Sequence, residues 1–160
     1  MFQSVEDAKL IKQILSSAKT IAMVGVSSIK KEVSTNIKRR PSIIVMKYLQ
    51  EFGYRVIPIN PSSAGKVAYG ETIVAKLKDV NIPVDIVNVF RPSIEAPVLA
   101  EQTVEIGAKV LWLQYGIQNQ EAKQIVNSAN ISYIANRCIK QEYQRLFLNI
   151  NPVFPALKTD

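Results

Sequence analysis

The chain has 160 residues, of which 48% are hydrophobic and 21% charged. This size and composition are typical of one folded globular domain and exclude an intrinsically disordered chain. The sequence has no histidine and a single cysteine, Cys138. The single cysteine excludes an internal disulfide. The absence of histidine excludes His-dependent nucleophilic catalysis and removes the commonest metal ligand. We therefore expect neither a metal site nor catalytic residues.

The formal net charge of +7 has two readings: a lysine-rich surface that keeps the protein soluble, or an anionic partner. The first residues lack the basic start and apolar stretch of a signal peptide. No apolar run reaches the roughly 18 residues that a membrane span needs. With its lone cysteine, the chain is expected to be a cytoplasmic protein without a membrane partner.

The predicted elements begin with a helix over residues 4–17, where apolar residues recur at helical spacing. A continuous apolar run then predicts a strand over residues 20–26, buried on both faces as in a parallel sheet. A polar loop follows as far as Pro41. The chain continues with a helix over residues 42–52 and a second strand over residues 54–59.

The second part of the chain repeats this alternation. A turn-rich loop over residues 60–71 leads into a short predicted helix over residues 72–78. The remaining predicted elements alternate in type: strand 84–90, helix 93–106, strand 108–113, helix 120–129, strand 132–135 and helix 140–147. Such alternation is typical of βαβ units. It predicts one α/β domain over residues 1–160, with its core in residues 8–147, an irregular tail over residues 148–160, and a Rossmann-like open parallel sheet of about five strands with helices on both faces.

In such a sheet, ligands bind beyond the carboxyl ends of the strands, where the strand order reverses. The segment Gly25-Val26-Ser27-Ser28 follows the first strand and is a candidate phosphate loop, in which backbone N–H groups would hold a diphosphate. It has one glycine where the dinucleotide motif G-x-G-x-x-G needs three, so an ordinary turn stays as the alternative. The second strand ends in Asn60-Pro61 rather than the acid usual in NAD-binding domains, which favours a phosphorylated ribose.

Much of the positive charge lies in one short segment. Between Ser27 and Pro41 the chain carries five basic residues and one acid, a net +4 of the total +7. The basic residues are Lys30, Lys31, Lys38, Arg39 and Arg40, and the acid is Glu32. Their position beside the candidate phosphate loop predicts a small anionic ligand rather than a nucleic acid, for which no recognition motif is present.

These residues carry a family resemblance. The matching stretches are IAMVGVS at 21–27, RPSIIVMKYLQEFGYRVIPINPSSAG at 40–65, VDIVNVFRPSIEAP at 84–97, GAKVLWLQYGIQNQEA at 107–122 and NRCIKQEY at 136–143. In this order they resemble the CoA-binding protein family, small stand-alone Rossmann proteins related to the nucleotide-binding domain of the succinyl-CoA synthetase α-subunit. Two features depart from the family pattern: the loop over residues 29–39 is expanded, and Asn136 stands where an aspartate is frequent.

The resemblance implies that the ligand is coenzyme A or an acyl-CoA, and it suggests contacts by position. The cofactor-binding residues implied in this way are Gly25, Val26, Ser27, Arg40, Ser42, Asn60, Pro61, Phe90, Arg91, Gln114, Arg137 and Cys138. The candidate phosphate loop and the basic segment beside it add Ser28 and Lys30. For Gln114 a structural amide, and for Cys138 an inert packing role, are the alternatives. A further hypothesis is a mixed disulfide between Cys138 and the CoA thiol, with the positive charge of Arg137 favouring the thiolate.

Three functions follow as hypotheses. The first is a non-catalytic binding or sensing module for CoA. The second is an enzyme, either a nicotinamide-dependent oxidoreductase or an acyl-CoA-handling enzyme, and the missing histidine and incomplete glycine motif count against it. The third is a nucleic-acid-binding protein, suggested only by the charge. A homo-oligomer is compatible with all three.

Overall fold

The computed structural model describes residues 5–26 and 41–150. Predictions that concern residues 27–40, or the tail from residue 151 onward, therefore lie outside the described residues. The five strands of the main sheet are β1 (Thr20–Val24), β2 (Arg55–Ile59), β5 (Ile86–Val89), β6 (Val110–Leu113) and β7 (Ser132–Ile134). Each neighbouring pair is parallel, in the order β2-β1-β5-β6-β7. The predicted Rossmann-like α/β fold is confirmed.

This order places the reversal of the sheet between β1 and β5. From β1 the chain crosses outward to β2, then returns to the other side of β1 and continues outward through β5, β6 and β7. The carboxyl ends of β1 and β5, at Gly25 and Phe90, therefore flank the point at which crossovers leave in opposite directions. In open parallel sheets this is the usual position of a ligand crevice.

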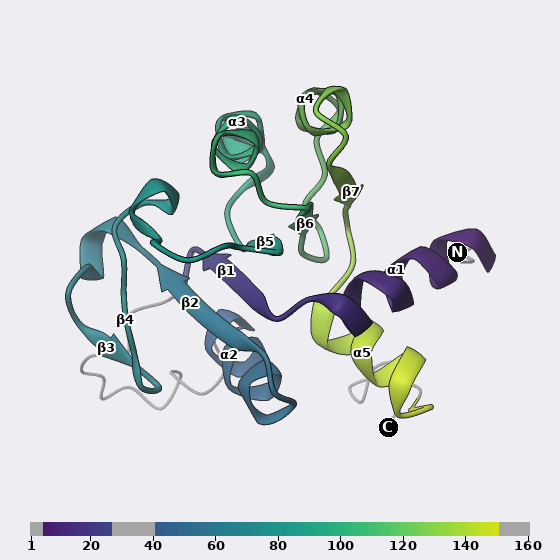
Figure 1. Ribbon diagram of the computed structural model, residues 1–160, viewed down its shortest axis with the longest axis horizontal. Helices are drawn as coiled ribbons and strands as arrows, with labels where there is room; N and C mark the ends of the chain where they lie inside the picture. Colours follow the sequence, from purple (N-terminus) through teal and green to yellow (C-terminus); the bar gives the residue numbers. More distant parts are fainter. Residues whose placement is uncertain (1–4, 27–40, 151–160) are drawn as a thin grey trace.

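Helices cover both faces of the sheet (Figure 1). One face carries α1 (Val5–Ser17), α2 (Pro41–Glu51) and α5 (Ile139–Phe147), and the other carries α3 (Ala96–Ile106) and α4 (Gln120–Ser128). The strands are buried along almost their whole length because each face is covered. None of the helices in the described ranges has the length and apolar character that a membrane crossing requires.

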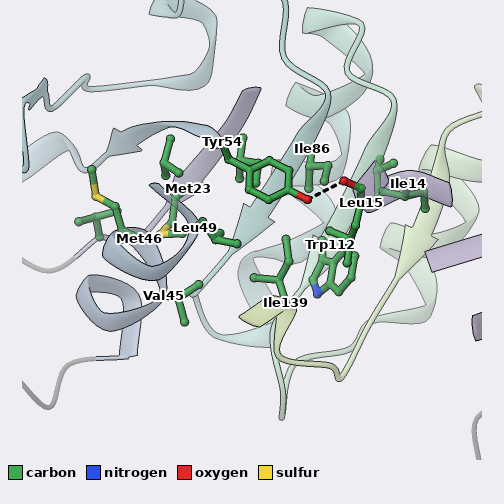
Figure 2. Packing of buried hydrophobic residues seen from close by; sticks show 14 of the residues in the cluster. Ile14, Leu15, Met23, Val45, Met46, Leu49, Tyr54, Ile86, Trp112 and Ile139 are labelled. Carbon is green, nitrogen blue, oxygen red and sulfur yellow. Dashed lines mark hydrogen bonds between the residues drawn. The ribbon is translucent and has the colours of Figure 1, made fainter. Parts of the chain in front are cut away.

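Two hydrophobic clusters lie on the two faces. Figure 2 shows the first, between the sheet and α1, α2 and α5, with Trp112 fully buried near Ile139. In this cluster the Tyr54 hydroxyl donates a hydrogen bond to the Leu15 carbonyl at 2.5 Å, which ties the start of β2 to α1. The second cluster fills the space between the sheet and α3 and α4, and includes Val24, Ile59 and Leu77.

The predicted helix over residues 72–78 is wrong. Residues 67–72 form a small antiparallel hairpin of β3 (Val67–Ala68) and β4 (Glu71–Thr72). Val74 then pairs in parallel with Ile59 at the end of β2, and the Asn60 N–H donates to the Val74 carbonyl at 2.9 Å. Only a 3₁₀ turn, η3 (Leu77–Asp79), follows. Pairing with the edge of the sheet outweighs the local helical pattern of this segment.

The predicted boundaries differ elsewhere by a few residues. Two further 3₁₀ turns, η2 (Pro61–Ser63) and η4 (Ser93–Glu95), follow β2 and β5. The helix predicted from Ser93 therefore begins as η4, and its α-helical part starts at Ala96. This turn places Glu95 one helical turn after Arg91, beside the carboxyl edge of the sheet.

Candidate functional site

A cavity of about 950 Å³ opens at the carboxyl ends of β1 and β2, on the face of the sheet that carries α3. Its floor comes from the strand ends, one wall from the segment before and within η3, and the other wall from η4 and α3. The lining residues are Val24, Gly25, Ile59, Asn60, Pro61, Ser62, Ala75, Lys76, Leu77, Lys78, Arg91, Ile94, Glu95, Val98, Leu99, Gln102 and Glu105. The volume lies at the upper end of the range of small-molecule and cofactor sites.

Gly25 brings the backbone of the first strand end close to the next strand. Its φ is +95°, and a Cβ at this position would lie 2.9 Å from the Phe90 carbonyl oxygen and 2.9 Å from Arg91 Cδ. No side chain fits there. The Gly25 and Val26 N–H groups both donate to the Ile59 carbonyl, at 3.0 and 3.4 Å. Gly25 therefore allows Phe90 and Arg91 to pack closely against the strand end. Its N–H already donates a hydrogen bond within the protein.

Asn60 joins three segments at the end of β2. Its Nδ2 donates to the Val26 carbonyl at 2.6 Å, and its Oδ1 accepts from the Ser62 N–H at 2.9 Å and the Ser62 hydroxyl at 2.8 Å. The amide thereby caps η2 and connects it to the loop after β1. An aspartate could accept the two Ser62 bonds but could not donate to Val26. This explains in physical terms why an amide rather than an acid ends the second strand.

Arg91 and Glu95 form a bidentate ion pair in the cavity wall. Arg91 Nε donates to Glu95 Oε1 at 3.0 Å, and Arg91 Nη2 donates to Oε2 at 2.7 Å. The hydrogen bond from Arg91 lowers the pKa of Glu95, and the same bond raises the pKa of Arg91. The side chains are 46% and 42% exposed, so solvent and an incoming ligand reach both groups.

Four of the predicted site residues line this cavity, namely Gly25, Asn60, Pro61 and Arg91. Lys76 and Lys78 also line the cavity but were not expected at the site, because the sequence predicts a short helix over residues 72–78. The sequence reasoning also missed the apolar wall from Ile94 and Val98, which are 84% and 57% exposed. One signal in the sequence could have indicated this wall: Ile94 and Val98 are spaced i,i+4 at the start of a helix. The buried face of that helix is formed by other residues, Ala96, Ala100 and Thr103.

Three other predicted residues face the opposite side of the sheet. Val26 is fully buried in the first cluster, and the Phe90 side chain packs against it. Gln114 is 6% exposed, and its Oε1 accepts from Asn88 Nδ2 at 3.0 Å and from the Ile139 N–H at 3.1 Å. These bonds fix the amide between β5, β6 and the start of α5. The amide oxygen of Gln114 therefore has a structural role, which is the alternative to a ligand contact given above.

Arg137 and Cys138 also lie outside the cavity, at the start of α5. Trp112 Nε1 donates to the Arg137 carbonyl at 2.8 Å, and the Arg137 guanidinium lies 3.7 Å from Asp7 and 3.8 Å from Glu142. Cys138 occupies the N-cap position of α5 and packs, partly buried, against the first cluster. The hypothesis of a mixed disulfide with CoA stays a prediction.

Ser42 is 2% exposed in the first turn of α2. The remaining predicted contacts, Ser27, Ser28, Lys30 and Arg40, lie outside the described residues. Among the residues that are described, no three Cys, Asp or Glu side chains gather into a potential metal site.

Comparison with known proteins identifies the family. Residues 19–144 match the model of the CoA binding domain. The protein YneT of Bacillus subtilis (strain 168) is 40% identical over 130 residues, which cover 81% of this chain and 89% of YneT. A solved structure from Thermus thermophilus is 36% identical with a TM-score of 0.78, covering 88% of this chain and 98% of its own.

A second solved structure, from Pyrococcus horikoshii OT3, is 34% identical with a TM-score of 0.78, and the match covers 91% of this chain and 97% of that one. The matched residues include all five strands of the main sheet and the whole cavity. The chain belongs to the CoA-binding domain family.

Proposed function

We propose that the chain binds coenzyme A in the cavity beside Gly25, as a binding or sensing module. The observation that carries the proposal is the cavity itself, which lies at the carboxyl end of the strand before the reversal in strand order. At this point the missing Cβ of Gly25 lets Phe90 and Arg91 pack directly against the strand end, which brings the Arg91 side chain into the cavity wall. Membership of the CoA-binding domain family supports the same ligand.

The lining of the cavity suits the parts of CoA. Leu77, Ile94, Val98 and Leu99 offer apolar surface on two walls, against which an adenine ring can pack. Lys76, Lys78 and Arg91 supply three cations for phosphate groups. Asn60 has an amide where NAD-binding domains usually have a carboxylate for the ribose diol, and both polar atoms of this amide are bonded within the protein.

The proposal gives the chain a small-molecule partner in a reducing cytoplasm and requires no nucleic acid. The sequence supports this through its lone cysteine and through five basic residues between Ser27 and Pro41, in the segment that follows the first strand. No reaction is assigned to the chain.

Calorimetric titration with CoA tests the proposal. We expect one CoA per chain, and several-fold weaker binding when Lys76 and Lys78 are both replaced by Gln, since the phosphates lose two cations. The matched control replaces Lys9 and Lys123, which are exposed on α1 and α4 and do not line the cavity. Absence of CoA binding by the wild-type chain, or equal losses in both double variants, contradicts the proposal.

A further inference from the structure

The cavity contains a carboxylate where an anionic ligand would bind. Of its five charged lining residues, Lys76, Lys78 and Arg91 are basic, and Glu95 and Glu105 are acidic. Glu95 takes up the Nε and Nη2 donors of Arg91 in a bidentate pair, the arrangement that guanidinium groups also use for phosphate. The strongest phosphate-binding group in the cavity is thus already engaged by an internal anion.

The position of Arg91 means that its ion pair with Glu95 would affect ligand binding. Its Cδ lies 2.9 Å from the place where a Gly25 Cβ would be, so the stem of Arg91 packs against the backbone at the end of β1. A phosphate that approaches the backbone at Gly25 meets this guanidinium. It also meets the Glu95 carboxylate, which repels it.

We propose that Glu95 is an affinity-determining residue that holds Arg91 until a ligand phosphate replaces its carboxylate on the guanidinium. This inference rests on the proposed CoA function and adds a competitor to the same site. The ion pair is more than two-fifths exposed on both sides, and such pairs are weak. A doubly charged phosphate can therefore displace the carboxylate, whereas a singly charged carboxylate ligand gains little from the exchange.

The chain provides a matched control in Glu105. It lines the same cavity, carries the same charge and makes no ion pair with any described residue. Glu105→Gln removes one negative charge from the cavity and leaves Arg91 paired. Glu95→Gln removes the same charge and also releases Arg91.

Titration of CoA into these variants at physiological salt tests the proposal. We expect Glu95→Gln to bind CoA about three- to fivefold more tightly than wild type, the size set by an exposed ion pair. Glu105→Gln should change the affinity less than about twofold, because solvent and salt screen a charge that has no ion-pair partner among the described residues. In an Arg91→Gln background, the additional effect of Glu95→Gln should fall to that of Glu105→Gln.

The outcomes are separable. If Glu95→Gln binds CoA more weakly than wild type, Glu95 positions Arg91 for the ligand and the proposal is overturned. An equal gain in the Glu95 and Glu105 variants, or a gain that persists without Arg91, also overturns it. If wild type does not bind CoA, the proposed function fails, and the same variants titrated with inorganic pyrophosphate still decide whether Glu95 competes for Arg91. Circular dichroism confirms that each variant is folded.

Discussion

Asn60 connects two segments at the floor of the cavity through its side-chain amide. Its amide donates to Val26 and accepts from Ser62, so it holds the loop after β1 against the start of η2. The carboxamide is required for this because the two functions need a donor and an acceptor on one short side chain. The shape of the cavity floor therefore depends on the amide nitrogen, which no apolar or acidic residue supplies.

The nearly isosteric change Asn60→Asp should destabilise the protein. The carboxylate would face the Val26 carbonyl without a proton to donate, and leaving that acceptor unsatisfied costs about 1–3 kcal/mol. Urea unfolding at neutral pH measures this free energy. Ser62→Ala is the control, because it removes one hydroxyl donor to Asn60 Oδ1 but leaves the Val26 bond intact. Equal stability of Asn60→Asp and wild type would contradict this assignment.

Gly25 should be essential for binding but not for folding. In Gly25→Val, the new side chain would overlap the Phe90 carbonyl and push Arg91 away from the strand end, so we expect CoA affinity to fall at least tenfold, by an order-of-magnitude estimate. The backbone strain of a positive φ adds a stability cost of about 1–3 kcal/mol. Calorimetry and thermal unfolding measure the two effects separately.

Gly53 offers the matched control for this substitution. Its φ of +99° is nearly that of Gly25, but no atom lies within 4 Å of a Cβ built there. Gly53→Val should therefore carry a similar backbone cost and retain CoA affinity. If both variants lose affinity equally, the cause is strain and not the space beside Arg91.

At the level of elements, sequence patterns predicted the five strands of the main sheet and the five α-helices of the described residues. These patterns succeed because a strand covered on both faces must be apolar throughout, as in β1 and β6. They failed for residues 72–78, where the pairing of Val74 with Ile59 decides the conformation. A contact with a residue fifteen positions away leaves no mark on local periodicity.

Tyr54, which connects β2 to α1, should make the stability of the protein fall at alkaline pH. Burial of Tyr54, with a smaller contribution from Tyr143, raises its pKa from 10.0 to about 12. Between these values the unfolded chain releases the phenolic proton and the folded chain retains it. The stabilisation is complete below pH 10 and is lost as the pH rises toward 12, by at most about 3 kcal/mol.

Comparison with Tyr54→Phe isolates this effect from other titrating groups. Near neutral pH the variant should be less stable by about 1 kcal/mol, because the hydrogen bond to the Leu15 carbonyl is lost. The difference between wild type and variant should shrink, and then reverse, as the pH rises above 10. Urea unfolding across this pH range measures the difference in free energy of unfolding. Tyr115→Phe is the control, because Tyr115 is 75% exposed. Parallel pH curves for wild type and Tyr54→Phe would rule out the titration of Tyr54.

At the level of the whole molecule, the strand-end rule selected residues at the edge of the sheet where the cavity opens, but it did not distinguish the two faces of the sheet. The strand-end rule identified Gly25, Asn60, Pro61 and Arg91, all of which line the cavity. It also selected Phe90 and Gln114, whose side chains lie on the face of α2 and α5. Which face is hollow depends on how η3 and α3 pack, and that packing follows from tertiary contacts that no local pattern encodes.

The last prediction concerns ligand choice by the folded molecule. CoA carries a phosphomonoester in addition to its diphosphate, whereas NAD has only the diphosphate and a cationic ring. Lys76, Lys78 and Arg91 line a cavity whose strand end lacks an acid, so CoA should stabilise the native state more. At a hundred times its Kd a ligand adds about 2.7 kcal/mol, which for a domain of this size raises Tm by about 5–11 °C. Thermal unfolding with equal concentrations of CoA and NAD measures both shifts, and Gly25→Val should lose the CoA shift. A larger shift with NAD would instead support the nicotinamide-dependent alternative, because in that case the ribose diol would be accepted without a carboxylate at the end of β2.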